Sequence, residues 1–167
     1  MSEYSKEFVK DIAKRTNENL KNYHGTYDVT QLINSAIGLL IIPHEKYYAR
    51  IDNSLISSQM LSDMRKSIRQ NTYLEETDEI ELRDIVKHIR NGIAHSRIYF
   101  DSNNGKLCEI QILDHRKSYT RMDKKSGKNT VIPAADFEIV LSVTILRQFM
   151  MEFSEAIISK DIERKGR

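Results

Sequence analysis

The sequence predicts a mainly α fold: a bundle of four to five helices with a small antiparallel β-hairpin or meander inserted before the C-terminal helix. Two observations lead to this fold class. Apolar residues recur at the spacing of a helical turn through most of the chain. After Ser96 the period changes from about 3.6 residues to 2, which is typical of strands. The length of 167 residues suits a single domain over 1–167, with the β insert at about 97–132 and a frayed tail at 160–167.

Three segments carry the helical pattern in the first half of the chain. Residues 5–22 have a thin apolar stripe among charged and amide side chains. Residues 28–42 are apolar almost all round, which indicates a helix buried on most sides, and Pro43 is expected to end it. Residues 54–70 repeat apolar positions at helical spacing, although their serines compete for backbone hydrogen bonds.

The stretch 78–98, DEIELRDIVKHIRNGIAHSRI, gathers more potential chemistry than any other. Asp78 and Glu81 form a capping-box pattern at its start. One face of the expected helix is apolar, and Arg90 sits at the shoulder between the faces. The opposite face is polar and carries two imidazoles; its members are Asp84, His88, Asn91 and His95.

The β insert and the last helix follow this stretch. Residues 97–101 and 107–113 predict two strands, joined by a turn at 103–105 because Asn and Gly tolerate positive φ. A second short hairpin is expected around 125–128. Residues 133–159 are the most apolar segment and are expected to form a final helix, opened by a proline, at the centre of the core.

Composition and motifs exclude several classes of function. Glycine-rich phosphate loops, HExxH and cysteine pairs are all absent from the sequence, so we expect no cofactor and no metal. The net charge of +2 neither requires nor excludes a nucleic-acid partner. Cys108, the single cysteine, fits a reducing compartment. The longest apolar run, 36–42, is too short to span a bilayer, so a cytoplasmic protein without membrane association is expected.

Arg90, Asn91 and His95 are the candidate catalytic residues. A histidine can take and give protons at cellular pH, and an arginine presents a planar fork to phosphate oxygens. The pair suits phosphodiester cleavage, in which Arg90 holds the phosphate and His95 handles the 2′-hydroxyl or the leaving oxygen. Asn91 lies one turn before His95 and could orient its ring.

A plain structural interpretation competes with this one. Asn91 and Gly92 could end the helix, which would leave Arg90 and His95 merely near the C-terminal end of its dipole. The bare Arg-x4-His spacing is weak, because it recurs in the same helix as Arg83 and His88. Gly92 is also expected to loosen the helix relative to an alanine.

The segment RNGIAH, residues 90–95, resembles the R-N-x-x-x-H signature of the HEPN superfamily, whose core is a small α-helical bundle. The ordered segments 33–48, 82–98 and 99–114, followed by an apolar C-terminal helix, resemble the plasmid-encoded HEPN subgroup. In that subgroup a β-hairpin interrupts the bundle after the signature helix. The resemblance covers about 28–159.

The resemblance implies a metal-independent endoribonuclease, acting as a homodimer whose two signature helices build one composite cleft. Arg90 and His95 match the catalytic positions and Asn91 the polar position after the arginine, whereas no role carries over to His88 or Arg83. The implied reaction gives a 2′,3′-cyclic phosphate and a 5′-hydroxyl. The resemblance further implies a bacterial toxin or antiviral effector, with a cognate antitoxin as a partner.

RNA contacts are expected from Lys87 and Arg97, which lie near the motif. Tyr47 and Tyr48 could stack on bases, although packing within the bundle is the favoured interpretation for both. Two alternatives to a ribonuclease stay open. One is a non-catalytic HEPN module that binds RNA or a protein through the polar face. The other is a structural helical protein in which Asn91 begins an ordinary turn.

Overall fold

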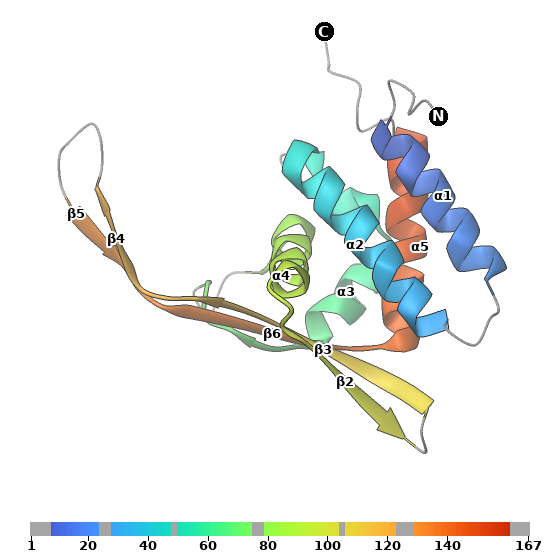
Figure 1. Ribbon diagram of the computed structural model, residues 1–167. Helices are drawn as coiled ribbons and strands as arrows, with labels where there is room; N and C mark the ends of the chain where they lie inside the picture. Colours follow the sequence, from blue (N-terminus) through green and yellow to red (C-terminus); the bar gives the residue numbers. More distant parts are fainter. Residues whose placement is uncertain are drawn as a thin grey trace, which may run out of the picture.

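Helices gather on one side of an antiparallel sheet in the computed structural model (Figure 1). The structure describes residues 8–23, 28–47, 50–74, 79–103, 106–122 and 129–160. Within these ranges it has the five α-helices α1 (Phe8–Asn22), α2 (Asp28–Tyr47), α3 (Ser58–Lys66), α4 (Leu82–Ala94) and α5 (Val143–Lys160). A short 3-10 helix, η2 (Asn53–Leu55), precedes α3.

The described strands form two sheets. The larger sheet has the order β1-β6-β3-β2, and every neighbouring pair is antiparallel. Its strands are β1 (Ile68–Asn71), β2 (Ile98–Asn103), β3 (Lys106–Arg116) and β6 (Ala135–Ser142). The smaller sheet pairs β4 (Tyr119–Met122) with β5 (Asn129–Ile132) and extends from the end of the β3–β6 pair as a separate ribbon (Figure 1).

The core lies between the helices and the sheet. Helix α4 runs between α2 and the sheet, and α1, α2 and α5 pack beside one another (Figure 1). Ile85 and Ile89 of α4, Ile112 of β3, and Phe137 of β6 are at most 1% exposed and belong to one hydrophobic cluster. The position of α4, with one side on the helices and another on the sheet, decides which of its polar residues meet solvent.

The prediction of a mainly α fold is confirmed, but the sheet is larger than the small hairpin or meander that was predicted. The prediction of a final helix over 133–159 was wrong in its first part, because 135–142 is strand β6 and the helix begins only at Val143. Along β6 buried and partly exposed residues alternate strictly. This period of 2 was present in the sequence, and the high apolar content of the whole segment obscured it.

Three boundaries also differ from prediction. Helix α2 continues past Pro43 to Tyr47, so the proline does not end it. The helix predicted over 54–70 is shorter, because Ile68 begins strand β1, which pairs with β6. Glu81 is the N-cap of α4 and forms an ion pair with Arg83, so it is not the third residue of a capping box. Asp78, the cap predicted from the sequence, lies outside the described residues.

Candidate functional site

Gly92 brings α4 against strand β3. A Cβ atom at this position would lie 2.4 Å from Cγ2 of Ile112 and 2.7 Å from the carbonyl oxygen of Leu113, closer than real Cβ atoms come. A side chain of any kind would therefore push the helix off the sheet. The sequence suggested only that Gly92 loosens the helix, whereas the structure uses it for close approach.

The helix does not end at Asn91. It runs to Ala94, and the turn that follows has the hydrogen bonds of a Schellman motif. The Arg97 N–H donates to the Gly92 carbonyl at 2.8 Å, and the Ser96 N–H donates to the Ile93 carbonyl at 3.0 Å. Ser96 adopts a φ of 55°, the left-handed conformation that such a turn requires. His95 is the C-cap of α4, and its side chain is exposed.

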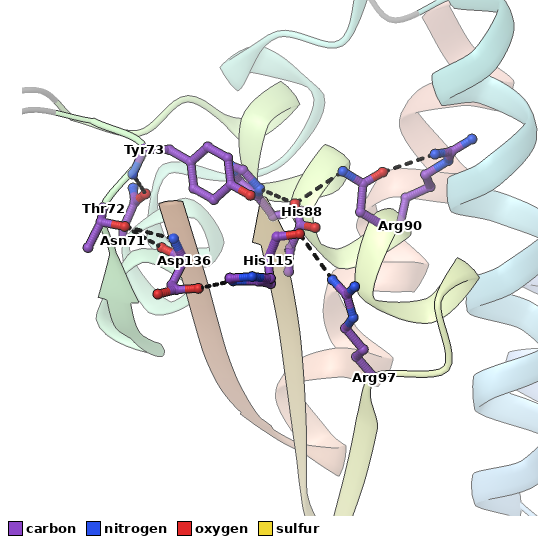
Figure 2. Close-up of polar contacts among 10 residues, drawn as sticks. Asn71, Thr72, Tyr73, His88, Arg90, Arg97, His115 and Asp136 are labelled. Atoms are coloured by element: carbon purple, nitrogen blue, oxygen red, sulfur yellow. Dashed lines mark hydrogen bonds and ion pairs between the residues drawn. The ribbon is translucent and has the colours of Figure 1, made fainter. Parts of the chain in front are cut away.

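A chain of side-chain hydrogen bonds connects the motif to the sheet (Figure 2). Arg90 donates through Nη1 to Oδ1 of Asn91 at 2.9 Å. Asn91 donates in turn through Nδ2 to Oδ2 of Asp114, on β3, at 3.1 Å. The same carboxylate oxygen lies 2.8 Å from Nδ1 of His88 and accepts its N–H. The guanidinium of Arg90 is thus oriented by a residue that a buried carboxylate orients.

His88 belongs to the interior and not to a free polar face. Its side chain is 3% exposed and lies between Tyr73 and Phe137, with both ring centroids 4.4 Å away. The polar face predicted for the helix is therefore divided: His88 faces the sheet, whereas His95 faces solvent. The exposed stripe of α4 instead contains Ala94 and His95, with Lys87, Arg90 and Asn91 partly exposed beside them.

The local environment keeps Asp114 ionised and Tyr73 neutral. Burial raises the pKa of the Asp114 carboxyl, but the hydrogen bonds from His88 and Asn91 outweigh it, so that the pKa lies below its usual range. Burial, and after it the charge of Asp114, raises the pKa of Tyr73 to about 12. The network at neutral pH therefore consists of a carboxylate with N–H donors around it and a neutral phenol ring against His88.

The residues expected to contact RNA lie in different places. Arg97 follows the turn after α4 and donates through Nη1 to the carbonyl of His115 at 3.2 Å (Figure 2). Lys87 is partly exposed, one turn before Asn91 on α4. The side chain of Tyr47 and the whole of Tyr48 lie outside the described residues.

Asp114 is the site residue that sequence reasoning missed. Strand β3 alternates, and Ile110, Ile112 and Asp114 are all buried on one face. An acidic residue at a position of the strand that points to the core indicates a buried hydrogen-bond partner, because burying a carboxylate without a partner is costly. The pattern was readable from the sequence, although the identity of its partners was not.

Among the residues with a described placement, no group of three or more His, Cys, Asp or Glu side chains could hold a metal ion. Across the same ranges, none of the helices has both the length and the apolar content needed to cross a bilayer.

Comparisons with known proteins give one match. The family model described as HEPN pEK499 p136 matches residues 1–164, which is nearly the whole chain. The comparison with curated proteins and that with solved structures each found no significant match.

Proposed function

The chain belongs to the HEPN family described as HEPN pEK499 p136, and from this premise we propose that it is a metal-independent endoribonuclease. Its catalytic residues are Arg90 and His95, and Asn91 positions the arginine. Membership of a family whose domains are often ribonucleases supports the class of activity. The residue assignments rest on the motif together with the contacts around it.

One observation carries the proposal: the hydrogen-bond chain from Asp114 through Asn91 to Arg90. A partly exposed arginine is ordinarily free to sample many rotamers. Here its guanidinium is oriented by an amide whose other end bonds a carboxylate that is 5% exposed. Such preorganisation is what phosphate binding needs, because the geometry is fixed before the substrate arrives.

The reaction follows from these positions. Arg90 binds a non-bridging phosphate oxygen and stabilises the charge that develops on it. The 2′-oxygen attacks phosphorus and loses its proton to one imidazole, while the 5′-oxygen leaves and gains a proton from a second imidazole. The products are a 2′,3′-cyclic phosphate and a 5′-hydroxyl.

The motif has one histidine, His95, so two motif imidazoles at one phosphate require two copies of the chain. His95 is exposed at the end of the α4 stripe, and the other motif histidine would be His95 of the partner subunit. The exposed Ala94 beside it offers a small side chain where two helices could approach closely. We place the homodimer interface on this stripe. A toxin or antiviral role, held in check by a cognate antitoxin, is the biological setting that the family resemblance supports.

The test uses purified protein, single-stranded RNA and a chelator. His95→Ala and Arg90→Ala are each expected to lower the cleavage rate by about 10²-fold or more, since each removes a group that acts in the transition state. Arg83→Ala is the matched control, because Arg83 lies on the same helix, partly exposed, outside the motif. End-group analysis should find a cyclic phosphate.

Thermal melts and circular dichroism establish that each variant is folded. Cleavage by both motif variants at the rate of the parent would refute the site assignment. Wild-type protein that binds RNA and leaves it whole would instead favour the non-catalytic module.

A further inference from the structure

The positive charge of the chain is concentrated in one segment. Residues 115–132 contain six Lys and Arg and a single acidic residue, Asp123, which gives a net charge of +5. The whole chain has a net charge of +2, so the remaining residues sum to −3. The near-neutral net charge of the chain is therefore the sum of a strongly basic segment and a remainder with a small negative charge.

Of this segment the structure describes 115–122 and 129–132, which include the β4–β5 ribbon, and the ribbon projects from the body (Figure 1). All four residues of β4 are exposed, so this strand buries neither of its faces in the core. Its large side chains are open to solvent: Tyr119 is 49% exposed, Met122 63% and Val131 69%. Lys117 and Arg121 are exposed as well. An isolated two-stranded ribbon contributes little to stability, which indicates a surface kept for a ligand.

We propose that the β4–β5 ribbon, together with Lys117 in the link that joins it to β3, is an RNA-binding arm that captures single-stranded substrate for the site on α4. The proposal rests on the proposed function, because it takes RNA as the substrate. Lys117 and Arg121 neutralise phosphates, and Tyr119 stacks on a base. This combination of cations with an exposed aromatic ring is what binds single strands without reading their sequence.

A basic path leads from the arm to the motif. Arg116, at the end of β3, lies over the Tyr73 ring with its Cζ 4.8 Å from the centroid. Arg97 bonds the carbonyl of the neighbouring His115 and is itself two residues after His95. The seven steps along the chain from His115 to Met122 span at most about 25 Å. An RNA strand on the arm would continue past these cations toward the exposed end of α4.

A second copy of the chain is the other occupant to consider, since Met122 and Val131 are apolar and exposed. Charge argues against pairing of two arms with each other, because each carries the same basic segment. RNA is a polyanion and complements the exposed cations Lys117 and Arg121.

The experiment measures RNA binding in the His95→Ala protein, so that cleavage does not interfere. Fluorescence anisotropy with a labelled single-stranded RNA compares this protein with its Lys117→Ala/Arg121→Ala derivative. Loss of two phosphate contacts is expected to make the negative slope of log affinity against log salt less steep by about 1.4. At low salt the affinity should fall roughly fivefold to tenfold. Lys14→Ala/Lys66→Ala is the matched control, since both lysines are exposed on helices away from the arm.

Tyr119 gives a second, charge-independent readout. Tyr119→Ala is expected to weaken binding about fivefold or more, whereas Tyr119→Phe should keep it, because stacking needs the ring and not the hydroxyl. Light scattering on every variant reports the oligomeric state. RNA affinity that is absent, or unchanged by all arm variants, would overturn the proposal, and a loss of dimer with unchanged RNA affinity would assign the arm to a protein contact.

The outcomes for the arm and for the ribonuclease are separable. Wild-type protein that never cleaves RNA, yet binds it through the arm, would refute the catalytic proposal and support the arm. If cleavage depends on His95 while RNA affinity is unchanged by substitution of Lys117, Arg121 and Tyr119, the catalytic proposal is supported and the arm is refuted.

Discussion

The α4–β3 contact and the β4–β5 arm are both rich in polar residues, and they differ in almost every other respect. At the contact, His88 and Asp114 are 3% and 5% exposed and bonded to each other. On the arm, Tyr119 and Arg121 face solvent on a strand with no buried residue. The first region holds side chains in one arrangement, and the second presents them without fixing them.

This difference matches the two tasks that the proposed ribonuclease would have to perform. Transition-state stabilisation needs atoms placed within fractions of an ångström, which buried networks provide because unsatisfied alternatives are costly. Capture of a polyanion needs charge in the right region and tolerates mobile side chains. Changes of a single atom should therefore matter at the contact, whereas only charge and stacking should matter on the arm.

The largest effect is expected from Gly92→Ala. The added methyl would overlap Ile112 and the Leu113 carbonyl, so the free energy of unfolding should fall by about 3 kcal/mol. Gly38→Ala in α2 is the control, because a Cβ there would lie 4.0 Å from Ile12 and meet only ordinary contact. That variant should gain about 0.5–1 kcal/mol. Urea unfolding measures both, and equal effects would break the claim that α4 is held at its closest distance from the sheet.

The sequence predicts an element correctly where the interactions that define the element are local in the chain. The helix carrying RNGIAH was predicted from its own apolar period, and the structure has α4 there. The high apolar content of 133–159 predicts helix throughout and outweighs the alternation in its first third, where the structure has strand β6. The predicted meander is part of a four-stranded sheet, because the structure adds strands β1 and β6. These two strands pair although more than sixty residues separate them in the sequence.

The candidate site shows the same limit. Arg90, Asn91 and His95 lie on one helix and were found together from their spacing. His88 was placed on a solvent face, because helical geometry alone cannot say that a sheet covers that face. Asp114 is 23 residues from Asn91, and only the fold brings the two side chains to 3.1 Å. Non-local contacts of this kind explain both the correction and the omission.

Asp114→Asn tests the contact next. His88 and Asn91 both donate to one oxygen of this carboxylate, Oδ2. An amide that keeps its carbonyl oxygen there loses the negative charge that strengthens both bonds, and an amide turned the other way places an NH2 group against two donors. We expect a loss of about 1–3 kcal/mol in stability and of roughly tenfold or more in cleavage rate. Asp136→Asn is the control, since that carboxylate pairs with His115 at the surface and should cost under about 0.5 kcal/mol.

A double-mutant cycle distinguishes positioning from general damage. If Asp114 acts through Arg90, then Asp114→Asn should lower the residual cleavage of Arg90→Ala no further, while its cost in stability remains. Additive losses in activity would mean that the carboxylate supports the fold and not the arginine.

The acid limb of stability reports the same carboxyl. Its pKa in the folded protein lies below the ordinary value of 3.8, so its contribution is complete above pH 3.8 and is lost as pH falls through the folded pKa. The difference in unfolding free energy between the wild type and Asp114→Asn should be constant near neutrality and shrink below pH 3.8. Urea unfolding at a series of pH values measures it. A difference that already shrinks near neutral pH would mean that burial outweighs the hydrogen bonds.

The smallest effect is expected at the turn that ends α4. Ser96 has a φ of 55°, which a glycine adopts without the clash of a Cβ, so Ser96→Gly should gain about 0.5–1 kcal/mol. Ala94→Gly, in the last helical turn, should lose a similar amount. Thermal melts compare the stability of the two variants, and cleavage assays test whether Ser96 contributes to activity. A variant that is more stable and cuts as well would show that the strain has no role at His95. One that is more stable and cuts more slowly would mean that the stiffer serine backbone holds the imidazole in place, as Asn91, itself bonded to Asp114, orients the guanidinium.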